Sequence, residues 1–180
     1  MGASAFRRAR DGSVSLVLHP DEAPVLRGLL EQLAELVAPP EPADDDPLAA
    51  LVGIGTTTSA PEDPVLARLF PDAYAGDELA SAEFRRYTET SLRERKWADA
   101  TTALATLDAP GPTYPLDDEQ VNAWLGSLND LRLALGTRLD VQEDWVSQIA
   151  DLPADDPRQV LFGLYDWLSM LQELLVRCLR

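Results

Sequence analysis

Residues 156–178 read DPRQVLFGLYDWLSMLQELLVRC, and this stretch decides the fold class. Asp156 and Pro157 stand where a helix begins, because proline is tolerated in the first turn. The apolar side chains that follow recur at alternating steps of three and four residues: Leu161, Leu164, Leu168, Leu171, Leu175 and Cys178. Val160, Trp167 and Leu174 widen this stripe. A stripe of that width predicts a helix at the centre of a bundle and not one strand of a two-stranded coiled coil.

Four further helices are predicted by apolar spacing and proline boundaries, over residues 20–38, 65–70, about 77–107 and 117–138. The last of these begins at Asp117, which with Gln120 three residues later forms the pattern of a capping box. We therefore expect a mainly α fold, a helical bundle of about four or five helices.

A short β-hairpin is predicted at the N-terminus, over residues 6–18. Asp11-Gly12 is a pair that supplies the positive φ angles of a type I′ turn. Val14, Leu16 and Leu18 alternate in the second strand and share one face. We expect the hairpin to pack on the helices, so that residues 1–180 form a single domain.

Residues 38–64 differ in composition from the rest of the chain. They hold six acidic residues, six prolines and no base, which is typical of a solvated, poorly ordered segment. Leu48 to Ile54 form an apolar island inside it, and helical spacing there allows one docked turn. We expect the segment to be flexible.

Composition excludes most classes of enzyme. The chain has one histidine, His19, and one cysteine, Cys178. General bases, thiolate nucleophiles and transition-metal ligands come mainly from these two residue types. His19 has no second histidine or nearby cysteine to work with and is expected to be a polar corner residue. We therefore expect a protein that is not an enzyme and that holds no metal and no cofactor.

Charge and hydropathy constrain the partners. With 31 acidic and 15 basic residues the formal charge is −16, so a duplex phosphate backbone repels the protein, and no direct nucleic-acid binding is expected. No run approaches the ~20 apolar residues that cross a bilayer, so no membrane association is expected. A lone thiol and the absence of a signal-peptide pattern favour a reduced, cytoplasmic location.

Cys178 has two interpretations. It continues the leucine stripe, and a buried cysteine behaves as a small hydrophobe with a raised pKa. It also lies two residues from Arg180, where helices fray, and an exposed thiol beside Arg177 and Arg180 would be a redox site. The buried interpretation is favoured.

The helix around residues 84–97 carries a cationic arc of about 100° on an otherwise acidic protein. Its members are Arg85, Arg86, Arg93 and Lys96, opposite a stripe that holds Phe84, Tyr87 and Ala98. Glu89 lies within the arc and is placed to pair with Arg85 and Arg93 four residues away, which favours a salt-bridged surface. The alternative is a binding site for an acidic partner, with Trp97 as an anchor at its edge.

Five segments, in this order, resemble an actinobacterial family of oxidative-stress transcriptional regulators, the AosR-like proteins. They are residues 10–22, 63–73, 83–93, 121–139 and 164–168. The resemblance implies a regulator that acts through a protein partner, a sigma factor of RNA polymerase, and that is gated by a Cys-x-x-x-Cys disulfide. Here Leu174 stands four residues before Cys178, so we expect that redox pair to be absent from this chain.

These observations lead to one preferred function and two alternatives. The first is a non-enzymatic, cytoplasmic regulator of transcription in oxidative stress that works through protein contacts and allows a homodimer. The second is a structural or adaptor module of a proteolysis or sulfur-metabolism pathway. The third is an enzyme that uses carboxylates alone, which a deep pocket lined by converging acids would favour.

Overall fold

The computed structural model describes residues 5–39, 59–74, 76–150, 152–153 and 155–180. Most of the predicted flexible segment, including the apolar island at 48–54, lies outside these residues. The elements in chain order are β1 (Ala5–Arg8), β2 (Val14–Val17), α1 (Glu22–Val37), α3 (Pro64–Leu69), α4 (Glu78–Thr106), β3 (Thr113–Leu116), α5 (Asp118–Arg138), α6 (Trp145–Ala150) and α7 (Arg158–Cys178).

The mainly α prediction is confirmed, and the predicted helices fall close to their observed bounds. The described residues hold six helices where about four or five were expected, because the short helix α6 was not predicted. None of its six residues is buried, so no apolar stripe marks it in the sequence. The capping box of α5 is present: the Asp117 side chain accepts from the Gln120 amide at 2.8 Å, and Gln120 Oε1 accepts from the Asp117 amide at 3.0 Å.

The N-terminal hairpin is confirmed, but its predicted type I′ turn is wrong. Strands β1 and β2 pair antiparallel with Phe6 opposite Leu16. Gly12 has a φ of +90°, whereas Asp11 lies outside the positive-φ region. The Asp11 carboxylate accepts hydrogen bonds from the amide (3.0 Å) and the hydroxyl (2.7 Å) of Ser13. This contact holds a longer loop, in which only the glycine needs a left-handed conformation.

A third strand, β3, was not predicted and completes the sheet in the order β1-β2-β3. It pairs antiparallel with β2, with Tyr114 opposite Leu16 and Leu116 opposite Val14. Both Tyr114 and Leu116 are buried. The strand is four residues long and contains Pro115, which suits the edge of a sheet. Its pairing depends on a strand about one hundred positions earlier, so the local sequence carries little signal for it.

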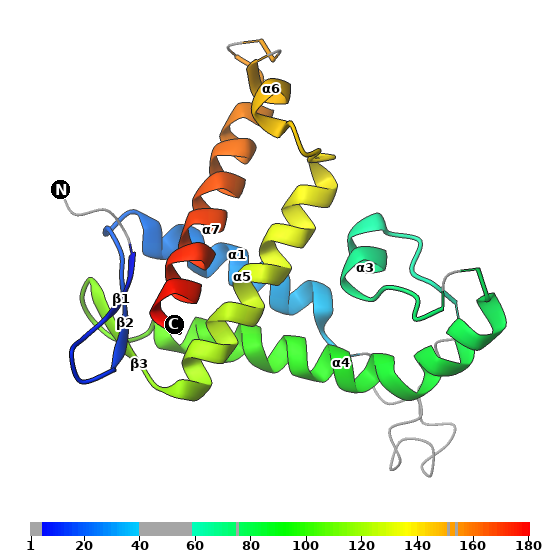
Figure 1. Ribbon diagram of the computed structural model, residues 1–180, viewed down its shortest axis with the longest axis horizontal. Coiled ribbons are helices and arrows are strands. Elements are labelled where there is room, and N and C mark those ends of the chain that lie inside the picture. The colour runs from blue at the N-terminus through cyan, green and yellow to red at the C-terminus, as the bar shows by residue number, and fades with distance from the viewer. Residues whose placement is uncertain (1–4, 40–58, 75, 151, 154) are drawn as a thin grey trace.

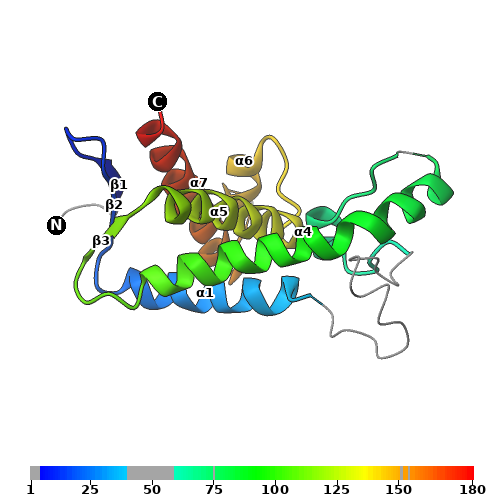
Figure 2. The ribbon, with the colours of Figure 1, turned by 90° about the horizontal axis from the view of Figure 1, so that it is seen from below.

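The helices pack into a bundle around a core shared with the sheet. Helices α1 and α4 lie side by side and run in opposite directions (Figure 2), while α5 and α7 pack together and β1 contacts α7 (Figure 1). Trp124 on α5 is fully buried, meets the ring of Phe6 edge-on at 6.0 Å and donates to the Thr106 hydroxyl at 3.0 Å. Helix α3 packs on α5, and the N-terminal half of α4 extends beyond the packed region (Figure 1) and contacts the loop that follows α3.

Candidate functional site

Cys178 lies in the core at the end of α7, and its residue is 8% exposed. Burial raises the pKa of its thiol, and the charge of Arg8 opposes that rise. The Arg8 guanidinium also donates to the Cys178 carbonyl at 3.1 Å. Arg177, which sequence reasoning placed beside the thiol, instead pairs with Glu173 at 3.0 Å. The predicted burial is confirmed, and a redox role of Cys178 stays a prediction.

The cationic arc of α4 faces inward, so the expectation of an exposed cationic surface is wrong. The Arg85 side chain is 5% exposed, and those of Arg93 and Lys96 are 14% and 13% exposed. Lys96 pairs with Asp130 of α5 at 2.7 Å. Of the four predicted cations only Arg86 is exposed, and it lies 5.9 Å from the centre of the Tyr87 ring.

Glu89 is the centre of this buried ion-pair cluster, and the predicted pairing is confirmed. Its two carboxylate oxygens accept from Arg85 at 2.6 Å and from Arg93 at 2.9 Å. Glu89 is itself 6% exposed. A buried carboxylate between two guanidinium groups is compensated by charge-assisted hydrogen bonds, which offset part of the free energy of desolvation.

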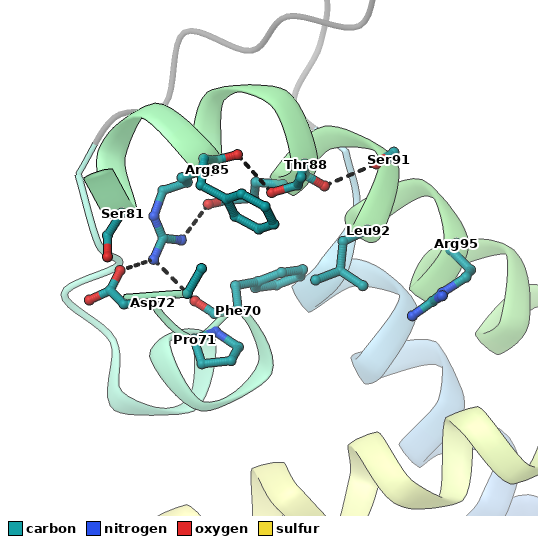
Figure 3. Close-up of a pocket in the computed structure, with 12 residues that line it drawn as sticks. Phe70, Pro71, Asp72, Ser81, Arg85, Thr88, Ser91, Leu92 and Arg95 are labelled. Atoms are coloured by element: carbon teal, nitrogen blue, oxygen red, sulfur yellow. Dashed lines mark hydrogen bonds and ion pairs between the residues drawn. The ribbon is translucent and has the colours of Figure 1, made fainter. Parts of the chain in front are cut away.

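The arginines of the cluster bind the loop that follows α3. Arg85 donates to the Phe70 carbonyl at 3.2 Å and to the Asp72 carboxylate at 2.7 Å (Figure 3). Burial disfavours the charged form of Arg85 and acts to lower its pKa. The hydrogen bonds to Glu89 and Asp72 outweigh this effect, so the pKa of Arg85 is raised. The Arg93 guanidinium lies 4.2 Å from the centre of the Phe70 ring. These contacts explain why the cationic side of α4 faces inward, because the loop at 70–72 supplies partners that the sequence of α4 does not reveal.

Three aromatic side chains of α4 lie on the surface of the protein. Phe84, Tyr87 and Trp97 are 45%, 54% and 43% exposed. Trp97 was predicted at the edge of a partner site and lies on the surface, while three of the cations predicted beside it are turned inward. The structure therefore does not bring Arg85, Arg93 and Lys96 onto one exposed surface with Trp97.

A pocket of about 610 Å³ lies between the N-terminal half of α4 and the loop after α3 (Figure 3). Its wall on α4 is a stripe at steps of three and four residues: Ser81, Arg85, Thr88, Leu92 and Arg95. Phe70, Pro71 and Asp72 contribute the opposite wall. Sequence reasoning missed this pocket, because its stripe is mostly polar and only apolar stripes were read as buried faces.

The pocket does not have the converging acids that a carboxylate enzyme needs. Asp72 and Glu89 are its only carboxylates among the described residues, and both pair with Arg85. Among all the residues that the structure describes, no three His, Cys, Asp or Glu side chains lie close enough together to hold a metal ion. His19 lies at an exposed corner with Asp21 at 3.3 Å. None of the helices that the structure describes is long and apolar enough to span a membrane.

Comparison with known proteins identifies relatives over most of the chain. The putative oxidative stress regulator AosR of Mycobacterium leprae is 33% identical over 178 residues, which cover 91% of this chain and 81% of the relative. The oxidative stress regulators AosR of Mycobacterium bovis and Mycobacterium tuberculosis are each 32% identical over 174 residues, which cover 88% of this chain and 78% of each relative. No solved structure matches the chain significantly.

The family comparison gives the same picture. The family described as "Domain of unknown function (DUF2017)" matches residues 3–179, nearly the whole chain. The chain therefore belongs to the DUF2017 family and is similar over most of its length to mycobacterial proteins named oxidative stress regulators.

Proposed function

We propose that this chain is a non-enzymatic, cytoplasmic regulator of the oxidative-stress response. The observation that carries the proposal is the similarity of about nine tenths of the chain to proteins named oxidative stress regulators. The site chemistry supports it, because the two carboxylates that line the pocket, Asp72 and Glu89, are both held in ion pairs with arginine. Carboxylates engaged in this way serve the structure of the cluster and are not placed as a pair for acid–base chemistry.

We further propose that regulation works through contact with a protein partner, a sigma factor of RNA polymerase. The outer side of α4 supports this proposal, because Phe84, Tyr87 and Trp97 are exposed along one helix. Exposed aromatic side chains are enriched at protein interfaces, where they supply much of the binding free energy. A homodimer is part of the same proposal, and the mass of the purified protein in solution tests it.

The experiment is affinity capture of the tagged chain from its native host, with and without peroxide treatment, followed by mass spectrometry. We expect a sigma factor among the captured proteins, and we expect the purified pair to form a complex. Trp97→Ala and Tyr87→Ala should each weaken that complex. Val146→Ala is a matched control, because Val146 is 66% exposed but lies on α6, far from α4 in the sequence.

Two results would contradict the proposal. The first is a host lacking this protein that shows an unchanged transcriptional response to peroxide. The second is capture of protease subunits or sulfur-transfer enzymes with no subunit of RNA polymerase, which would support the adaptor alternative.

A further inference from the structure

The pocket between α4 and the loop after α3 has the size and lining of a small-molecule site. Its volume of about 610 Å³ falls within the range of roughly 300–1,000 Å³ that such sites occupy. Phe70, Pro71, Phe84 and Leu92 give it apolar walls. Figure 3 shows Leu92 extending from α4 toward the ring of Phe70. Two aromatic rings and a leucine suit a flat, apolar body.

One charged side chain of this pocket, Arg95, is exposed and is not engaged by the other lining residues. Arg95 lines the pocket and makes no hydrogen bond or ion pair within the described part of the chain. Its charge acts on the carboxyl group of Asp99, one turn along α4, and opposes the rise of the pKa of that group. Arg85, by contrast, already binds Asp72 and Glu89. Within the described part of the chain, the hydrogen-bond donors of the Arg95 guanidinium therefore remain available to a ligand in this pocket.

The position of Arg95 favours an anion although the protein as a whole is acidic. The pocket lining holds two guanidinium groups, Arg85 and Arg95, and two carboxylates, Asp72 and Glu89. Both carboxylates bind Arg85, so no carboxylate of the lining is paired with Arg95, in a chain whose formal charge is −16. A guanidinium is planar and binds a carboxylate through two parallel hydrogen bonds.

We propose that this pocket binds a small organic anion with a flat apolar body, such as an aromatic carboxylate. The carboxylate pairs with Arg95, and the apolar body lies against Phe70, Phe84 and Leu92. Ser81 does not serve the ligand, because its hydroxyl already bonds the backbone of Tyr74, accepting at 3.2 Å and donating at 2.9 Å. Arg85 keeps the loop in place, so the pocket is formed before the ligand arrives.

The test is a titration of the isotope-labelled full chain with 2-naphthoate, followed by nuclear magnetic resonance. We expect the shift changes to centre on the Leu92 methyl groups and on the Nε–H of Arg95. Arg95→Gln should weaken binding about tenfold, the effect of losing a charge-assisted contact of ordinary strength. The matched control is Arg86→Gln, which removes the same charge from the same helix but lies outside the pocket lining; it should change the affinity less than twofold.

The neutral isostere 2-naphthamide keeps the apolar body but lacks the negative charge, so it distinguishes their contributions to binding. It should bind about tenfold more weakly than 2-naphthoate. The proposal is overturned if both compounds bind equally or if Arg86→Gln weakens binding as much as Arg95→Gln. Absence of 2-naphthoate binding at millimolar concentration overturns it as well, as do shift changes centred on another part of the molecule. Circular dichroism of each variant verifies that it remains folded.

Discussion

The two halves of helix α4 are buried by opposite means. The C-terminal half places Ala100 and Ala103, both fully buried, in the apolar core. The N-terminal half buries Arg85 and Glu89, each 6% exposed, against the loop that follows α3. Apolar burial tolerates the loss of one contact in proportion to its area, whereas a buried charge depends on every member of its cluster. The stability of the C-terminal half of α4 should therefore respond gradually to the loss of a contact, whereas that of the N-terminal half depends on the complete ion-pair cluster.

Removal of Glu89 is expected to have the largest effect, because it leaves two guanidinium groups without their shared partner. Glu89→Ala should lower the free energy of unfolding by about 3–5 kcal/mol, the usual effect of breaking a buried ion pair. Chemical denaturation measures the total. Amide hydrogen exchange should show the loss of protection concentrated in α3 and the first half of α4.

The control for Glu89→Ala is Glu173→Ala, which breaks a pair of the same i, i+4 spacing on the exposed face of α7. That pair should contribute no more than about 0.5 kcal/mol. Equal effects of the two variants would show that the cluster around Glu89 is not buried in solution.

A cavity in the apolar core should have a smaller and less local effect. Leu171 on α7 is fully buried, and Leu171→Ala should lower the free energy of unfolding by about 3 kcal/mol through lost transfer energy and an unfilled cavity. Hydrogen exchange should accelerate throughout the bundle and not at the α3 end alone. A loss of protection restricted to the last turns of α7 would show that this helix is not central to the bundle.

Substitution and alkylation of Cys178 test whether the last turn of α7 is packed in the same core. Cys178→Ser should lower the free energy of unfolding by about 1–3 kcal/mol, because the hydroxyl is imperfectly bonded in an apolar site. Because burial raises the thiol pKa, the reactive thiolate is scarce at neutral pH, and alkylation of the folded protein should be slow. Rapid alkylation together with unchanged melting of the serine variant would revive a redox role for this cysteine.

Asp99 lies in the C-terminal half of α4, beside the buried Ala100, and is expected to give the smallest effect. Burial raises its pKa above the ordinary 3.8, although Arg95 opposes the rise. Its contribution to stability is therefore fully present below the unfolded pKa and is lost as pH rises through the folded pKa. Asp99→Asn should raise the free energy of unfolding by less than about 1 kcal/mol at pH 7.

That gain should disappear at pH values well below 3.8, where the carboxyl group is protonated in both states. Thermal melting of both proteins across this pH range gives the comparison. A gain that is independent of pH would assign the effect to packing against α5, where the Asp99 carboxylate lies close to Gly126, and not to charge.

Local patterns were sufficient to predict most of the helices. The leucine steps of α7 and the capping box at Asp117 each lie within a few residues of the chain, so the physical cause is readable in the sequence. The pairing of Glu89 with Arg85 and Arg93 was predictable for the same reason, because residues four apart on a helix are neighbours.

The mainly helical class, the N-terminal hairpin and the pairs of charges along α4 all follow from neighbours in the sequence. Tertiary structure decided strand β3, because Tyr114 pairs with a strand about one hundred positions earlier. It also decided which side of α4 is buried, because the Phe70 carbonyl and Asp72 compensate Arg85 from outside the helix. The free energy of burying a charge depends on the partners that surround it in space, and only the folded chain brings those partners together.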